Sequence, residues 1–160
     1  MTNPSAPCSK CKGEMTMTSL EPFQGEEGGL TLTIHDMPCL VCAQEHKRFI
    51  HLGFAAELMD RVMSADAYSN IPSAATKGFF KKHYHCPDCA AELPESPTGE
   101  KTQEVAAALK DAQPFKVVIR VPVFKCSGCG RECIHSAAET GQLAYKATGH
   151  AFRAMDIPPT

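Results

Sequence analysis

The sequence contains no tryptophan, and aromatic residues make up only 7% of its 160 residues. Large aromatic side chains supply much of the buried area of an ordinary core. Their scarcity, together with 12 prolines and 11 glycines that interrupt regular structure, predicts small, loop-rich units that need an added cross-link. A chain of this length has room for about one domain, or for two small ones.

The sequence also lacks the pattern of a secretory leader and of a membrane span. Its first residues, Met1-Thr-Asn-Pro-Ser-Ala-Pro7, include neither a basic nor an apolar segment. No apolar run approaches the roughly 18 residues that a membrane-spanning helix needs. We therefore expect a cytoplasmic protein without membrane contact. In that reducing compartment, paired cysteines bind metal more often than they form disulfides.

The chain has no excess of positive charge, since its formal net charge is −2. Residues 1–76 contain 5 Lys and Arg against 9 Asp and Glu, a balance of −4, whereas residues 77–160 contain 11 against 9, a balance of +2. A protein that binds nucleic acid mainly through phosphate contacts is usually more basic. Any nucleic-acid contact is therefore expected in the second half.

Cysteine is abundant, and eight of the nine cysteines form four Cys-x-x-Cys pairs. The pairs are Cys8 and Cys11, Cys39 and Cys42, Cys86 and Cys89, and Cys126 and Cys129. One such turn directs two thiolates at one ion, and two turns together complete a tetrahedral Zn²⁺ site. Zinc is therefore the favoured interpretation, ahead of iron–sulfur clusters, redox dithiols and structural disulfides.

The cysteine pairs belong to an approximate internal repeat. Cys11-Lys-Gly-Glu14-Met resembles Cys89-Ala-Ala-Glu92-Leu, and Cys42-Ala-Gln-Glu45-His46 resembles Cys129-Gly-Arg-Glu132-Cys133. The spacing differs, with 27 residues between Cys11 and Cys39 and 36 between Cys89 and Cys126. We interpret the chain as a tandem, duplicated zinc ribbon that binds two zinc ions. Sequential pairing assigns Cys8, Cys11, Cys39 and Cys42 to one ion and Cys86, Cys89, Cys126 and Cys129 to the other, and interleaved pairing is the alternative.

Local patterns predict a small α+β fold around these cysteines. Residues 30–35 and 115–125 alternate as strands do, and residues 53–67 and 101–112 have apolar side chains at helical spacing. Ser136-Ala-Ala-Glu139 has the spacing of a capping box and predicts a last helix to about residue 147. The expected organisation is a first ribbon at 1–50, a helix and linker at 51–76, a second ribbon with an inserted helix at 77–135, and a C-terminal helix with a mobile tail at 136–160.

Four sulfurs around one ion leave no open coordination position, so such sites stabilise a fold and do not activate water. The segment Pro38-Cys39-Leu-Val-Cys42 matches the Pro-Cys-x-x-Cys half of the zinc-deaminase signature. The other half, His-x-Glu, is missing upstream. No serine–histidine–aspartate set, phosphate loop or carboxylate pair stands out. We therefore expect a non-enzymatic protein that acts in protein–protein interaction or regulation.

His46 and Cys133 are the alternative metal ligands. They occupy equivalent positions in the two copies of the repeat, each four residues beyond the last cysteine of a pair. The simpler interpretation is that each lies on the strand leaving the metal turn and binds nothing. Cys133 is the ninth cysteine, and the sequence shows no cause for an unusually reactive thiol there.

The strip of residues 77–85 is the candidate contact surface. It combines basic and aromatic side chains, namely Lys77, Phe79, Phe80, Lys81, Lys82 and Tyr84. Such a strip can stack bases and neutralise phosphates, or it can supply an aromatic anchor to a protein interface. We favour a protein partner because the net charge is negative, and nucleic-acid binding is the alternative.

The first unit resembles the YgiT-type zinc finger. The likeness rests on the first cysteine pair, the 27-residue gap, the strand ending Ile34-His-Asp-Met-Pro-Cys39 and the second pair, over residues 8–46 and more loosely 86–133. That family forms the N-terminal domain of certain bacterial antitoxins. The resemblance implies a zinc-held, antitoxin-like fold that contacts a toxin-like protein, with Cys8, Cys11, Cys39 and Cys42 as ligands. Antitoxins of this type continue into a DNA-binding helix-turn-helix, whereas a second ribbon takes that place here.

Overall fold

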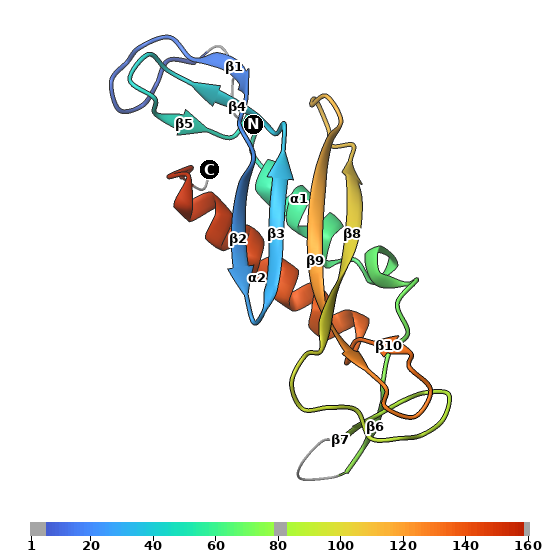
Figure 1. The fold of residues 1–160 in the computed structure, drawn as a ribbon. Helices are drawn as coiled ribbons and strands as arrows, with labels where there is room; N and C mark the ends of the chain where they lie inside the picture. Colours follow the sequence, from blue (N-terminus) through green and yellow to red (C-terminus); the bar gives the residue numbers. More distant parts are fainter. Residues whose placement is uncertain (1–5, 79–82, 159–160) are drawn as a thin grey trace.

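The structure is a computed structural model that describes residues 6–78 and 83–158. It confirms a small α+β fold with antiparallel sheets and two α-helices in the described part (Figure 1). In chain order the elements are β1 (Thr16–Ser19), β2 (Phe23–Glu27), β3 (Leu30–His35), β4 (Pro38–Val41), β5 (Lys47–Arg48), α1 (Phe54–Met63), the 3-10 turn η1 (Ala65–Tyr68), β6 (Ala75–Lys77), β7 (His83–His85), β8 (Gly99–Ala107), β9 (Phe115–Lys125), β10 (Glu132–Cys133) and α2 (Ala137–Ala154).

One central sheet joins the two halves of the chain. Its four main strands lie in the order β2-β3-β9-β8, and β10 continues the pairing at the end of β9. The middle ladder pairs β3 of the first half with β9 of the second half, from Thr31 opposite Arg120 to His35 opposite Lys116. The central sheet therefore contains strands from both sides of the expected boundaries at residues 50 and 76.

Strand β8 corrects the prediction of an inserted helix at 101–112. Nine residues of β8 pair with β9, from Gly99 opposite Val123 to Ala107 opposite Phe115. The apolar residues Val105 and Ala107 lie two apart, so they share one face of a strand, whereas Val105, Ala108 and Leu109 have helical spacing. The long ladder decides between the two patterns, because strand preference depends on cross-strand packing more than on intrinsic propensity.

The two other predicted helices are confirmed, with changed ends. Helix α1 and the 3-10 turn after it account for the expected helix at 53–67. Helix α2 begins as predicted, because the Ser136 hydroxyl accepts a hydrogen bond from the Glu139 N–H at 3.0 Å. It extends to Ala154, well beyond residue 147. The expected mobile tail is also corrected at Ile157, which is buried and donates its N–H to the Phe152 carbonyl at 3.1 Å.

Both helices cover the same face of the central sheet (Figure 1). The alternate residues of β3 and β9 that face the helices are buried, and those on the opposite face are at least partly exposed, except for Phe124. Three phenylalanines from separate segments meet over this face, with ring centroids 4.9 Å apart for Phe49 and Phe152 and 5.8 Å apart for Phe49 and Phe54. Helix α2 crosses β2 so closely that a Cβ at Gly25 would lie 1.9 Å from the Ala147 carbonyl oxygen.

The cysteine-rich turns lie at opposite ends of this layer. At one end, β1, β4 and β5 form a small sheet that holds the first and second cysteine pairs. At the other end, the β6–β7 hairpin and β10 surround the third and fourth pairs (Figure 1). This second end has a small core of its own, formed by Cys86, Leu93, Phe124, Cys126 and Cys133.

Candidate metal centres

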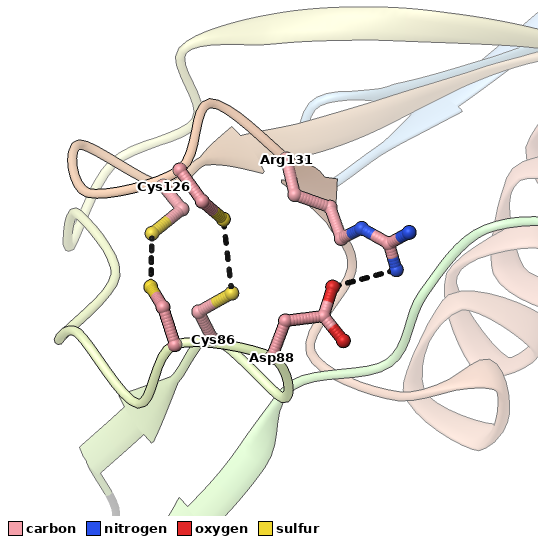
Figure 2. A network of polar contacts seen from close by, with 6 residues as sticks. Cys86, Asp88, Cys126 and Arg131 are labelled. Atoms are coloured by element: carbon pink, nitrogen blue, oxygen red, sulfur yellow. Dashed lines mark hydrogen bonds and ion pairs between the residues drawn. The ribbon is translucent and has the colours of Figure 1, made fainter.

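Four cysteines gather at the second end of the sheet, as the sequence predicted. The sulfurs of Cys86, Cys89, Cys126 and Cys129 all lie within 4.8 Å of one another. The Cys86 and Cys129 sulfurs are 3.6 Å apart, and those of Cys89 and Cys126 are 3.3 Å apart (Figure 2). A tetrahedral Zn²⁺ with Zn–S bonds of about 2.3 Å places its sulfurs about 3.8 Å apart. The group therefore has the spacing of a four-thiolate metal site, and all its cysteines are free of disulfides.

Matching backbone turns hold the two halves of this group. The Cys86 N–H donates to the Ala91 carbonyl, and the Cys126 N–H donates to the Arg131 carbonyl, each at 2.8 Å. Each turn closes with a residue at positive φ, Ala90 at 66° and Gly130 at 77°. Backbone N–H groups of the turn, chiefly the N–H of Cys129, point at the Cys126 sulfur. They lower the pKa of the Cys126 thiol to about 6. Such turns favour the thiolate that a metal requires.

One ion pair joins these two turns beside the sulfurs. The Arg131 guanidinium lies 2.7 Å from a carboxylate oxygen of Asp88 (Figure 2). Both side chains are about half exposed, so the pair adds little stability by itself. Its position nevertheless links the turn before β8 to the turn after β9.

The first end of the sheet has a different donor set, with three cysteines and one histidine. The ligand atoms of Cys8, Cys11, Cys42 and His46 lie within 4.8 Å of one another. His46 Nδ1 lies 3.4 Å from the sulfur of Cys8 and 3.4 Å from that of Cys42. The Cys11 and Cys42 sulfurs are 3.6 Å apart. Backbone N–H groups, chiefly that of Cys11, lower the pKa of the Cys8 thiol to about 6.

Cys39 lies outside this group, which corrects its prediction as a ligand. Its side chain is buried in β4, and its thiol lies 3.3 Å from the Arg48 carbonyl oxygen, to which it donates. Burial raises the pKa of the Cys39 thiol, which disfavours the thiolate. The reason is that β4 continues to Val41, so the metal turn begins at Cys42 and not at Cys39.

His46 takes the place of Cys39 in the group of candidate ligand atoms at this end. The Cys42 N–H donates to the His46 carbonyl at 3.1 Å, and Glu45 has φ of 65°. This turn is therefore one residue shorter than the turn at Cys126, and Cys42 takes the place that Cys126 has in the second half. This position favours the alternative that His46 is a metal ligand over the simpler interpretation that it binds nothing. The signal in the sequence was the spacing Cys42-x-x-x-His46.

Cys133 lies outside the second group of ligand atoms. Its side chain is fully buried in the small core with Leu93 and Phe124. Burial raises the pKa of the Cys133 thiol to about 11, so the thiol is protonated at neutral pH. Cys133 therefore packs in the small core beside the second group of cysteines.

The candidate contact strip is only partly described. Phe79, Phe80, Lys81 and Lys82 lie outside the described residues, whereas Lys77 is exposed in β6. The Tyr84 ring stacks on His135 with centroids 3.7 Å apart, and His135 stacks on Phe124 at 4.2 Å. Burial is the main cause that raises the pKa of Tyr84. Tyr84 thus joins β7 to the segment that leads into α2, which leaves one face of its ring unavailable to a partner.

Among the described residues, no helix combines the length and the apolar character that crossing a membrane requires. Comparisons of this chain with protein-family models, with curated proteins and with solved structures found no match.

Proposed function

We propose that this chain is a non-enzymatic zinc protein with two structural sites, which presents a rigid surface to a protein partner. The observation that carries the proposal is the closed donor set at each end of one sheet. Cys8, Cys11, Cys42 and His46 form the first set, and Cys86, Cys89, Cys126 and Cys129 form the second. Each set fills all four positions of a tetrahedral ion, as in structural zinc sites.

The donor chemistry supports zinc as the metal. Thiolate and imidazole ligands at tetrahedral spacing suit Zn²⁺, whereas magnesium and calcium require oxygen ligands. Three-cysteine, one-histidine and four-cysteine sets are both common in structural zinc sites. A structural zinc contributes about 10–16 kcal/mol of apparent binding free energy in small peptides, which is comparable to the stability of a whole small domain. The ions would therefore hold the small lobes at both ends.

A protein partner fits the charge of the chain better than nucleic acid does. The net charge is −2, and the first half has a balance of −4. The likeness of residues 8–46 to the YgiT-type finger supports a toxin-like protein as the kind of partner, in a cytoplasmic setting. The nucleic-acid alternative through residues 77–85 is weakened, because Tyr84 already stacks on His135.

Metal analysis and a binding comparison test this proposal. Native mass spectrometry should find two zinc ions per chain, and the visible spectrum should show no iron–sulfur absorbance. Salt titrations with single- and double-stranded DNA and RNA should show only weak binding at physiological salt. Iron absorbance, fewer than two ions, or micromolar nucleic-acid affinity at physiological salt would each contradict the proposal.

The partner itself can be sought by crosslinking in the source cells. The zinc-loaded chain should retain one specific protein, and a double variant, Cys42→Ser with Cys126→Ser, serves as the unfolded-lobe control. Retention of the same protein by both forms would show that the zinc-held ends do not take part.

A further inference from the structure

A cavity of about 260 Å³ opens beside the first metal centre. Its walls include the ligands Cys8 and His46, and three cationic side chains stand around it, those of Lys10, Lys47 and Arg48. None of the described residues that line it is acidic. The cavity therefore concentrates positive side chains that are not needed to bind the metal.

The positive charge at the cavity contrasts with the negative net charge of residues 1–76. Residues 1–76 have a balance of −4, yet four of their five basic residues belong to the first metal lobe, namely Lys10, Lys12, Lys47 and Arg48. Zn²⁺ with three thiolates and a neutral imidazole has a net charge of about −1. The two lysines that line the cavity outweigh this charge without Arg48, so the cavity stays positive with the metal bound.

The cations are placed by the turns that hold the metal. Lys10 lies between the ligands Cys8 and Cys11. Lys47 follows the ligand His46 and pairs with Val41 in β5. In the described part of the chain, no ion pair is formed by Lys10 or Lys47. Their charges remain available to a ligand, and a rigid turn lowers the entropy cost of using them.

Arg48 is fixed in place by the chain that precedes the first cysteine. Its guanidinium donates to the carbonyl of Ala6 at 3.0 Å and to that of Pro7 at 3.4 Å. These bonds orient the planar group at the cavity wall. Arg48 therefore helps to hold the cavity wall, whereas Lys10 and Lys47 provide donors that can turn toward a ligand.

The remaining walls and the size of the cavity restrict what it can hold. Met15 and Pro158 add an apolar side to the cationic one. Pockets for whole small-molecule ligands usually measure about 300–1,000 Å³, so this cavity suits a single side chain. A glutamate matches both sides, because its methylene groups can pack on Met15 while its carboxylate meets the lysines.

We propose that this cavity binds the carboxylate side chain of an acidic segment in the protein partner. The proposal rests on the proposed function, since it specifies which part of the partner is recognised. A polyanion such as single-stranded DNA fits less well, because the cavity is a recess for one group and the chain as a whole repels phosphate.

An NMR titration of the zinc-loaded full chain tests the site with a defined probe. The probe is a hexaglutamate peptide with blocked ends, and inorganic phosphate and a hexanucleotide of single-stranded DNA are the comparison ligands. The peptide should shift amide signals of Ser9, Lys10, Lys47 and Arg48 more than signals elsewhere. Lys10→Gln with Lys47→Gln should weaken the peptide about tenfold, because two charge contacts are lost.

The control is Lys110→Gln with Lys146→Gln, which removes two exposed lysines that do not line the cavity and should leave the affinity unchanged. Zinc content is measured for each variant, and the single changes Lys10→Gln and Lys47→Gln replace the double variant if it loses metal. Absent or scattered shifts, equal weakening by the control, or binding of DNA but not of peptide would overturn the proposal. If the crosslinked protein partner binds the chain while the peptide does not, only the cavity proposal fails.

Discussion

Leu32 of β3 lies directly opposite Ile119 of β9, and the two residues are counterparts in the two halves of the chain. Leu32 pairs on its other side with Gly25, which follows Cys8 by 17 positions. Ile119 pairs on its other side with Gln103, which follows Cys86 by 17 positions. An approximate twofold axis therefore passes through this pair, and it relates the two hairpins and the two metal turns that precede them.

The second half has more residues than the first between the two strands of its hairpin. Gly25 and Leu32 are 7 positions apart, whereas Gln103 and Ile119 are 16 apart, so the second hairpin is longer by nine residues. These residues dock on the first half. The Lys110 N–H donates to the Glu57 carboxylate at 3.2 Å, and Arg61 donates to the Ala108 carbonyl at 3.2 Å. The insertion thus fastens one half of the molecule to the helix of the other.

Truncation at the axis should weaken both halves together. Leu32 and Ile119 are both fully buried, so Leu32→Ala and Ile119→Ala should each lower the free energy of unfolding by about 2–5 kcal/mol. Urea unfolding of the zinc-loaded protein measures this. Thr33→Ala, on the opposite face of β3, is the control and should cost much less. Loss of structure confined to one half would contradict the shared sheet.

Substitutions should separate Cys39 from His46. Cys39→Ser should retain two zinc ions and cost about 1 kcal/mol, because serine can keep the hydrogen bond to the Arg48 carbonyl. His46→Ala should lose the ion of the first centre, and His46→Cys should retain it, since a thiolate replaces the imidazole. Native mass spectrometry counts the ions. Loss of one ion from Cys39→Ser with none lost from His46→Ala would restore the four-cysteine assignment.

Cys126→Ser should release the second ion alone. The lobe formed by β6, β7 and β10 depends on that centre, whereas the central sheet has a large core of its own. Proton–nitrogen NMR spectra should therefore lose the dispersed signals of the lobe and keep those of β3 and its neighbours. Release of both ions by this change would mean that the two centres fold as one unit.

Two glycines in strands provide a matched test of the helix–sheet contact. Gly25→Ala places a methyl group against the Ala147 carbonyl of α2, so it should destabilise the fold by about 1–3 kcal/mol or more. Gly99→Ala meets nothing closer than 3.8 Å and should be close to neutral. Thermal unfolding of the two variants compares them. Equal melting temperatures would show that α2 does not rest on β2 at this point.

Tyr68 should make stability depend on pH in alkaline solution. Burial raises the pKa of Tyr68 above its ordinary value of 10.0, and its hydroxyl donates to the Val62 carbonyl. The folded state favours the neutral phenol. The contribution of Tyr68 to the free energy of unfolding is therefore complete below pH 10 and is lost as the pH rises above 10. Tyr68→Phe should flatten the fall in unfolding free energy above pH 10. Tyr145→Phe removes a tyrosine that is 44% exposed and should leave the fall unchanged.

The sequence by itself determined the features that depend on neighbouring residues. The alternation of residues 30–35 and 115–125 predicts β3 and β9, because period-two side chains share one face of a strand. Ser136 predicts the start of α2 through its local cap. The first cysteine pair of each half predicts a metal turn, since both ligands and the turn lie within four residues.

Only the tertiary structure decided the features that depend on distant partners. The segment 101–107 suits a helix or a strand, and its ladder with β9 selects the strand. The spacing of Cys39 and Cys42 matches a metal turn, yet β4 pairs with β1 as far as Val41, so Cys39 is held in the sheet and His46 completes the donor set. The pairing of Leu32 with Ile119 has no trace in local pattern, because a contact between residues this far apart forms only when both hairpins bury the same apolar face.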